Sequence, residues 1–432
     1  MRKLKCAVVG YGDRGSRYSD YALKCPDELE VVAVVDPREV RRNAAKKAFS
    51  LPDEKVFVDI DKFLNVNIDC DFVINATMDQ LHYITATKLI DKGFDLLLEK
   101  PITAVPDELK DLYERSKKKG TKIVVCHVLR YTPFYSEIKN IIESGKMGKV
   151  VNLQLNEHVW YGHFVNAYVR GKWKSSKECG SGLLLAKCCH DTDLICWLNN
   201  GAKPVSVSSF GSKSLYSEKN APEGSTEYCY DCPKKGECPF NAYDFELKHD
   251  FIPFYTWIRI NKPLDEITEE EKIEYLKTDD FGKCVYRSGM DIVDRQCVSV
   301  EFDNGSIATL NMIAAGNSAG RHIHVVCEWG EIIGYVEENK LTVRYFDKKK
   351  LAFDTEIVDL NEVNKLKGND NSVTGHYGGD HFIMKDLVRF LQGEPVSSST
   401  TTIEDSLSGH FVVYAAERAR NERRVVDIKE FE

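Results

Sequence analysis

The sequence predicts an α/β protein with two domains: a doubly wound parallel-sheet domain, then an α+β domain built on a large, open, mostly antiparallel sheet. Apolar strand-like runs alternate with helical patterns over the first third of the chain. Afterwards apolar and polar residues alternate with a period of two, which is typical of half-exposed strands. A chain of 432 residues is also too long for one typical core. We therefore expect domains at residues 1–128 and 129–432.

Composition and charge narrow the function classes. Hydrophobic residues make up 43% and charged residues 29%, as in ordinary soluble proteins, and the net charge of −8 gives no reason to expect nucleic-acid or membrane partners. The first residues run straight into a strand, which leaves no room for a signal peptide, and no apolar run approaches the roughly 18 residues of a membrane span. We expect a cytoplasmic protein whose 14 cysteines are thiols or metal ligands.

Six strands are expected in the first domain, joined by helical crossovers. Their positions are residues 6–9, 31–35, 56–58, 70–76, 94–98 and 122–126. Gly93 and Gly120 follow two of the helical patterns, where helix-ending glycines belong. In such a sheet, ligands bind at the carboxyl ends of the strands.

A glycine-rich turn follows the first strand and predicts dinucleotide binding. Gly10, Gly12 and Gly15 have the G-x-G-x-x-G spacing, which allows a tight turn, close approach of a pyrophosphate, and close helix–strand packing. The second strand ends in Asp36, whose carboxylate can accept hydrogen bonds from a ribose diol and repel a 2′-phosphate. Because Arg38 offsets part of that repulsion, NAD is expected and NADP is less favoured. The other loop residues expected at the cofactor are Tyr11, Asp13 and Arg14. The alternative is a glycine loop with no ligand.

The second domain is expected to begin with a helix at 133–144. Strand-like stretches follow at residues 150–158, 205–210, 296–302, 307–312, 322–328 and 341–345, and a last helix at 407–420. Asp303, Asn304 and Gly305 predict a hairpin turn between two of these strands. Residues 213–285 are rich in loops, cysteine and charge, and are interpreted as an insertion.

Two short motifs carry candidate catalytic groups. Lys100, within Glu99-Lys100-Pro101, stands at a strand's carboxyl end, where an ammonium can bind a hydroxyl or take part in proton transfer. If residues 187–198 form one helix, Lys187, His190 and Asp191 share a face, and His190 is a candidate base. The alternatives are a surface lysine and a histidine that satisfies a buried carbonyl.

A dense polar and aromatic stretch at residues 158–173 suits sugar recognition. His163, Tyr168 and Arg170 are the candidates for holding a sugar ring, although an edge strand packed against a partner subunit would look similar. The loop at residues 376–381 either reaches the same cleft or caps the helix that follows it.

Four cysteines of the insertion are candidate zinc ligands. Cys229, Cys232 and Cys238 have a C-x-x-C-x(5)-C spacing, and Cys284 is the best fourth ligand, with His249 next. A closed four-ligand site would be structural, because it would hold together a segment without a core of its own. The alternative is a set of unligated thiols.

Taken together, these motifs resemble the glucose–fructose oxidoreductase, inositol dehydrogenase and rhizopine-catabolism (Gfo/Idh/MocA) family. The resemblance rests on the glycine motif, Asp36, Ala76-Thr77 with His82, Glu99-Lys100-Pro101, and His190-Asp191-x-Asp193. It implies an NAD(P)-binding Rossmann domain, a domain with a large open sheet, and dimers or tetramers. It also implies that Thr77, His82 and Glu99 lie at the cofactor, that Lys100 contacts nicotinamide ribose and substrate, that His190 lies beside the oxidised carbon, and that the Lys100–Pro101 bond is cis.

One position departs from the family pattern. Many family dehydrogenases carry an aspartate one turn before the histidine, but this chain has Ala186 there, followed by Lys187. The leading hypothesis is an NAD(P)-dependent oxidoreductase that transfers hydride from a carbinol of a sugar, sugar derivative or cyclitol. An NAD-dependent, redox-neutral glycoside hydrolase or lyase is the alternative, and a non-catalytic NAD-binding regulator is the third hypothesis.

Overall fold

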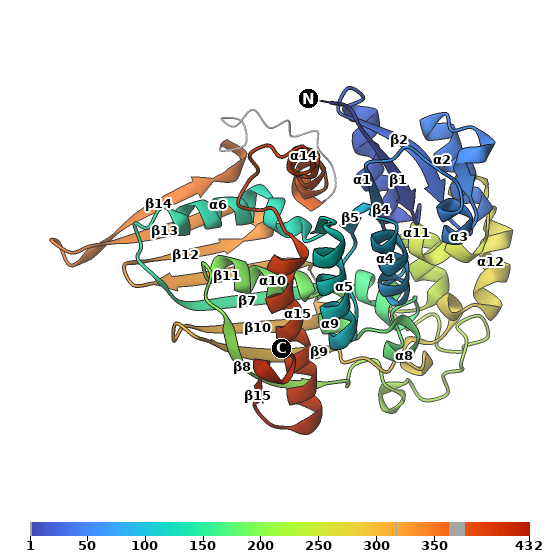
Figure 1. The fold of residues 1–432 in the computed structure, drawn as a ribbon. Coiled ribbons are helices and arrows are strands. Elements are labelled where there is room, and N and C mark those ends of the chain that lie inside the picture. The colour runs from blue at the N-terminus through green and yellow to red at the C-terminus, as the bar shows by residue number, and fades with distance from the viewer. Residues whose placement is uncertain (1, 317, 363–375) are drawn as a thin grey trace.

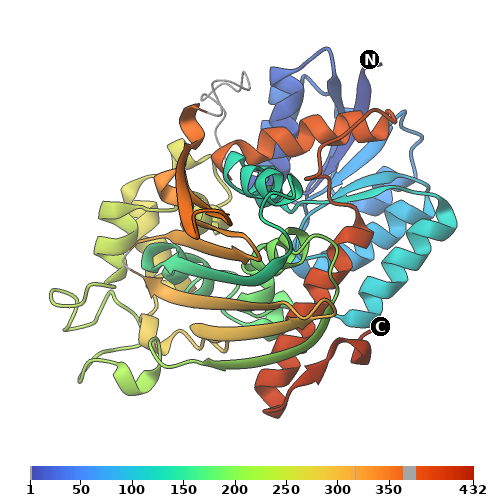
Figure 2. The ribbon, with the colours of Figure 1, turned by 90° about the vertical axis from the view of Figure 1, so that its left-hand side faces the viewer.

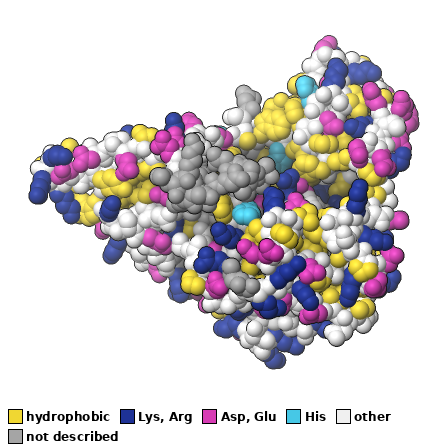
Figure 3. Space-filling model, turned by 90° about the horizontal axis from the view of Figure 1, so that it is seen from above, with side chains coloured by type: hydrophobic (Ala, Val, Ile, Leu, Met, Phe, Trp, Pro, Cys, Tyr) yellow, Lys and Arg dark blue, Asp and Glu magenta, His cyan; other side chains and the backbone are white. Residues whose placement is uncertain are grey.

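The computed structural model describes residues 2–316, 318–362 and 376–432 (Figure 1). It contains a six-stranded sheet from the amino-terminal part of the chain and a nine-stranded sheet from the carboxyl-terminal part. Both sheets are flanked by helices, and the α/β class predicted from the sequence is confirmed. Viewed from above, the nine-stranded sheet projects as an arm on one side, and positive and negative side chains are mixed on the visible face (Figure 3).

The first sheet is entirely parallel, with the order β3-β2-β1-β4-β5-β6. Its strands are β1 (Leu4–Val9), β2 (Leu29–Val35), β3 (Val56–Phe57), β4 (Phe72–Asn75), β5 (Asp95–Leu98) and β6 (Ile123–Val125), and its main helices are α1 (Asp13–Lys24), α2 (Glu39–Phe49), α3 (Ile60–Leu64), α4 (His82–Asp91) and α5 (Pro106–Lys119). The central strands are buried on both faces because helices cover both sides, which is why their sequences are continuously apolar. All six strands were predicted.

The second sheet is mixed, with one parallel pair, β10 with β7; the other described pairs are antiparallel. Its order is β14-β13-β12-β11-β7-β10-β9-β8-β15. The strands are β7 (Val150–Trp160), β8 (Pro204–Ser212), β9 (Arg295–Phe302), β10 (Ile307–Gly316), β11 (Gly320–Cys327), β12 (Gly330–Tyr335), β13 (Lys340–Asp347), β14 (Ala352–Asp359) and β15 (Val426–Asp427). Strands β12, β14 and β15 were not predicted.

Helices cover one face of this second sheet and tie it to the first. Helices α6 (Pro133–Glu143), α10 (Cys189–Leu198) and α15 (Ile403–Glu422) lie along that face (Figures 1 and 2). Thr402, the N-cap of α15, pairs with Val124 of β6, and α15 also packs against α5. Helix α14 (Gly379–Leu391) packs beside α1. The last parts of the chain therefore hold the two sheets together.

The insertion, predicted to be rich in loops, also contains short helices. It includes a π-helical turn (Tyr243–His249), α11 (Pro253–Thr256), a 3-10 turn (Trp257–Arg259) and α12 (Glu269–Thr278). Trp257, Leu276 and Phe281 form a small apolar core that belongs to the insertion alone. In the described ranges, no helix has the length and apolar character that crossing a membrane requires.

Candidate active site

The glycine turn after β1 is shaped for a dinucleotide. Gly10 has φ +91°, and a Cβ on it would lie 2.4 Å from the carbonyl oxygen of Ala76. A Cβ on Gly15 would lie 2.0 Å from the carbonyl oxygen of Gly10, so the turn and α1 can pack this closely only because both positions are glycine. At Gly12 the nearest group is the movable guanidinium of Arg41, at 3.5 Å. The backbone there is open to a ligand that displaces this side chain.

Asp36 lies at the carboxyl end of β2, next to this turn. Its carboxylate accepts hydrogen bonds from the amides of Tyr11 and Arg38, each at 2.9 Å, and Arg41 lies 3.4 Å away. The guanidinium of Arg38 donates to the carbonyl of Ile258 in the insertion. These contacts place a carboxylate where a ribose diol is expected and fit a bound dinucleotide.

Arg14 connects the glycine turn to the end of β5. Its guanidinium lies 3.0 Å from Glu99 and 2.6 Å from Asp380 at the start of α14. Glu99 is buried and also accepts from the Tyr18 hydroxyl at 2.7 Å and from the Lys100 amide at 2.9 Å. Despite the opposing effect of burial, His376 and Arg14 hold the pKa of the Asp380 carboxyl well below its usual range. The 376–381 loop thus reaches the cleft and also opens α14.

A histidine joins the loops that carry Thr77 and Lys100. The two ring nitrogens of His82 lie 2.6 Å from the carbonyl oxygen of Pro101 and 3.1 Å from that of Thr77. The Lys100–Pro101 peptide is cis, as the resemblance implied. The Nζ of Lys100 donates to the carbonyl of Ala186 at 2.9 Å. At Ala186, where the resemblance implies a carboxylate in many family dehydrogenases, a backbone oxygen therefore contacts the lysine.

His190 is only 6% exposed and lies close enough to Lys100 to feel its charge. Burial first, and then the positive charge of Lys100, hold the pKa of His190 well below its usual range. Its Nδ1 has no hydrogen-bond partner among the described residues. The ring is therefore neutral at physiological pH, and its unpartnered Nδ1 is free to meet a ligand.

The prediction of one helix over residues 187–198 is wrong at the start of that range. A short helix, α9 (Leu183–Ala186), ends before Lys187, and α10 begins at Cys189. Lys187 lies in the break, with its Nζ 3.5 Å from Glu157. Helix α10 is fixed by Asp193, which receives two hydrogen bonds from Arg130, at 2.6 and 2.7 Å.

Sequence reasoning missed the charge cluster next to Lys187. The Nε of Arg321 lies 2.7 Å from Glu157 and 2.8 Å from Asp191, so Asp191 has an arginine partner. The fully buried Asp191 thus holds an arginine in place. One signal was present: Glu157 of β7 is in phase with the buried Leu153, and a carboxylate on a buried face needs a partner.

The aromatic candidates pack against one another. The Tyr168 ring is 3% exposed and stacks on Trp173, with centroids 5.6 Å apart. The His163 ring lies 5.9 Å from the Tyr168 ring, and burial together with Lys187 lowers the pKa of His163 to about 3. Burial lowers the pKa of four histidines, which we call the buried histidines: the fully enclosed His127, His190 and His410, and the half-buried His163.

Arg170 does not face the cleft. Its side chain is fully buried, pairs with Glu246 at 3.3 Å, and donates to the carbonyl oxygens of Lys283 and Phe240 at 2.9 and 2.6 Å. Because its donors already have partners within the insertion, Arg170 is a structural residue in this arrangement and was misplaced as a sugar ligand.

Four thiols of the insertion, which we call the cysteine cluster, line one small cavity: Cys229, Cys232, Cys238 and Cys284. None of them forms a disulfide. Within the described ranges, however, no three His, Cys, Asp or Glu side chains are grouped at the spacing of metal ligands.

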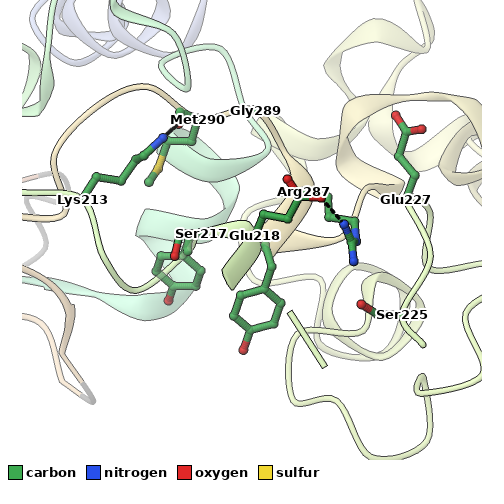
Figure 4. A pocket seen from close by; sticks show the side chains of 10 residues that line it. Lys213, Ser217, Glu218, Ser225, Glu227, Arg287, Gly289 and Met290 are labelled. Carbon is green, nitrogen blue, oxygen red and sulfur yellow. Dashed lines mark hydrogen bonds and ion pairs between the residues drawn. The ribbon is translucent and has the colours of Figure 1, made fainter. Parts of the chain in front are cut away.

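A larger cavity of about 510 Å³ lies next to the cysteine cluster (Figure 4). Glu218 and Arg287 at its wall pair with each other, and Lys213 donates to the carbonyl of Met290. None of the candidate cofactor or catalytic residues lines it, so it is separate from the site described above.

Comparison with known proteins identifies the family of both halves of the chain. Residues 4–127 match the model of an oxidoreductase family with an NAD-binding Rossmann fold, and residues 139–428 match the α/β carboxyl-terminal domain of the same family. YteT of Bacillus subtilis, which is named as an oxidoreductase, is 26% identical over 76% of this chain and 73% of its own length. The scyllo-inositol 2-dehydrogenase (NADP(+)) IolW of Bacillus subtilis is 26% identical over 42% of this chain, which spans 48% of IolW.

Solved structures share the fold along the whole chain. An NAD-binding oxidoreductase from Klebsiella pneumoniae superposes with a TM-score of 0.71 and 18% identity, covering 99% of both chains. A levoglucosan dehydrogenase in complex with NADH has a TM-score of 0.71 and 16% identity, again over 99% of both chains. Because both domain models match and together cover most of its length, this chain belongs to the Gfo/Idh/MocA family of NAD-binding oxidoreductases.

Proposed function

We propose that this oxidoreductase removes hydride from a secondary alcohol carbon of a neutral sugar, sugar derivative or cyclitol. The observation that carries the proposal is the hydrogen bond of 2.9 Å from Lys100, which follows β5 at the carboxyl edge of the parallel sheet, to the carbonyl of Ala186, four residues before His190. A bound nicotinamide supplies the hydride acceptor. The protein side chains must then bind the alcohol and take its proton.

The two candidate catalytic groups suit different parts of this task. His190, whose Nδ1 has no partner among the described residues, is proposed to accept the hydroxyl proton. The ammonium of Lys100 is oriented by the carbonyl of Ala186 and has further protons to donate to the substrate oxygen. Developing negative charge on that oxygen is stabilised by the ammonium.

The charges around the cleft favour a neutral substrate. Arg321 lies between Glu157 and Asp191, and Lys187 lies 3.5 Å from Glu157, so two cations face two carboxylates. A substrate that carries a charge would disturb this balance. His163 and the hydroxyl-bearing rings nearby are suited to hydrogen bonding with a polyhydroxyl ring.

The cofactor is proposed to be NAD rather than NADP. A 2′-phosphate would lie against the buried carboxylate of Asp36, and Arg38, which could compensate, already donates to Ile258. Asp36, the glycine turn, Thr77, His82 and Glu99 are the residues proposed to hold the dinucleotide.

Zinc in the cysteine cluster remains a proposal. Against the effect of burial, the amides of Thr226 and Lys234 lower the pKa of the Cys232 thiol, and amides of residues 240 and 286 face two of the other sulfurs. These contacts favour the thiolate of Cys232, but burial still raises the pKa of the Cys238 and Cys284 thiols, so zinc would have to displace their protons. The thiol side chains would have to rotate to close the site, because they do not converge in this structure.

A cytoplasmic homodimer or homotetramer is the proposed assembly. The face of the nine-stranded sheet opposite the helices exposes Phe210, Ile313 and Tyr335, at 76%, 42% and 40%. Apolar side chains on an open sheet face suit contact with a second copy.

The redox-neutral glycoside hydrolase is the second candidate, favoured by one observation. Ala186 replaces the carboxylate of the polyol dehydrogenases, so their proton path is incomplete here. Oxidation followed by elimination and reduction would leave no net NADH.

Substitutions test the catalytic assignment. Lys100→Ala and His190→Ala should each lower turnover by ~10²-fold or more if these groups handle the proton. Lys146→Ala, at an exposed turn, is the control and should behave as wild type. Near-normal turnover in both active-site variants would refute the assignment.

A further inference from the structure

One segment of the insertion crosses the edge of the parallel sheet where the cofactor is expected. On one side, the carbonyl of Ile258 accepts a hydrogen bond from Arg38, three residues beyond the end of β2. On the other side, the ring of Tyr255 packs against Trp173, with centroids 5.8 Å apart. The indole of Trp173 in turn donates to Asp79 at 2.9 Å, in the loop that follows β4.

The strand order shows that these contacts lie on both sides of the glycine turn. Strands β2 and β4 are the two neighbours of β1, whose end carries the glycine turn. Residues 253–259 therefore touch, directly or through Trp173, the loops on both sides of that turn. Figure 1 shows α11 near the same end of the first sheet. The crevice between β1 and β4, where the strand order reverses, is the place where such sheets bind dinucleotides.

Hydrogen bonds of two buried side chains hold residues 253–259 in place. The hydroxyl of Thr256 donates to Glu246 at 2.9 Å and accepts from Asn166 at 3.1 Å. Trp257 is 1% exposed and donates to Asp250 at 2.9 Å. These buried contacts make the segment a rigid part of the insertion.

Tyr255 is the side chain of this segment that faces the cleft. Its ring lies 6.1 Å from that of His163. Burial raises the pKa of Tyr255, and the charges of Asp13 and Asp79, which belong to the loops after β1 and β4, act in the same direction. Among the residues that the structure describes, its hydroxyl has no hydrogen-bond partner.

We infer that residues 253–259 form a roof over the cofactor cleft and that the Tyr255 hydroxyl is a ligand of the bound dinucleotide. The inference rests on the proposed function, since it concerns the same cofactor site. A roofed dinucleotide can leave only when the insertion or one of the sheets moves. We therefore expect slow release of NADH, which a weakened roof should accelerate.

Binding of NADH to the full-length protein, followed by fluorescence, tests this inference without any substrate. Tyr255→Phe removes one hydrogen bond and should raise both the Kd and the release rate by about 2- to 10-fold. Tyr255→Ala also removes the ring and should raise them further. Tyr230→Phe, an exposed tyrosine of the same insertion, is the matched control and should bind as wild type.

The outcomes separate the inference from the proposed function. If wild type binds NADH and both Tyr255 variants match its Kd and release rate, the roof is refuted while the proposed function stands. If wild type does not bind NADH at all, the proposed function fails and the roof fails with it. Should Tyr255→Ala not fold, Tyr255→Phe alone decides.

Discussion

Removal of Arg170 distinguishes a structural residue from a sugar ligand. The guanidinium is fully buried, lies 3.3 Å from Glu246 and donates to two backbone carbonyls. Arg170→Met would leave Glu246 as an uncompensated buried carboxylate, which costs about 3–5 kcal/mol of stability. We expect urea unfolding, followed by tryptophan fluorescence, to shift to lower urea by a corresponding amount, with KM for the substrate unchanged.

The pH dependence of this variant has a definite sign. Burial already raises the pKa of Glu246 to about 7, and Arg170 opposes that rise. Without the arginine the folded-state pKa rises further above the unfolded value near 4.5, so stability is lost as pH increases through the folded pKa. Arg170→Met should therefore be more destabilising at pH 8 than at pH 6.

Two controls complete the test. Arg170→Met combined with Glu246→Met removes both charges and should recover most of the lost stability. Arg424→Met breaks an ion pair on the surface and should leave the urea midpoint close to that of wild type. If Arg170→Met unfolds at the wild-type urea concentration but raises KM tenfold, the arginine contacts substrate and the structural interpretation is wrong.

Three further predictions follow from the site. Asp36→Ala should reduce the preference for NAD over NADP, measured as the ratio of the Kd for NADP to the Kd for NAD, by at least tenfold. An unchanged ratio would show that this carboxylate does not contact the ribose of the cofactor. The buried histidines are neutral in the folded protein but protonate near pH 6.5 when it is unfolded, so the free energy of unfolding should decrease below that pH. The expected decrease is up to about 1.4 kcal/mol per histidine and pH unit. A melting temperature that does not change from pH 7 to pH 5 would contradict this prediction. Wild-type protein purified without chelator should contain about one zinc ion per chain. A Cys238→Ser variant should lose this zinc, whereas a Cys297→Ser variant, altered at an exposed cysteine, should keep it. Less than half an equivalent of zinc in wild type would count against the metal site.

The parallel sheet was predictable because its signals are local. Apolar runs, glycine stops and the G-x-G-x-x-G turn each specify a few consecutive residues. The missed strands lack such signals. Strand β12 contains glycine at two of its six positions, β14 is an edge strand with nearly every residue exposed, and β15 has only two residues.

The sequence predicted the part of the site whose residues lie on one segment of the chain, but not the part that several segments form together. Lys100 and Glu99 follow a strand and could be placed from the sequence, whereas the Glu157–Arg321–Asp191 cluster joins three distant segments. Arg170 was misplaced because a polar and aromatic stretch has the same composition whether it faces a cleft or a buried carboxylate. Its partner, Glu246, lies 76 positions further along the chain.

The central claim is net hydride transfer at Lys100 and His190. The most direct measurement is the absorbance of NADH when the protein and NAD meet a panel of neutral sugars, cyclitols and glycosides. The account predicts net NADH formation with at least one neutral polyol, lost in both Lys100→Ala and His190→Ala and retained in Lys146→Ala. Release of an aglycone without NADH would identify the redox-neutral hydrolase instead, and no reaction with any compound while NAD stays bound would contradict the account.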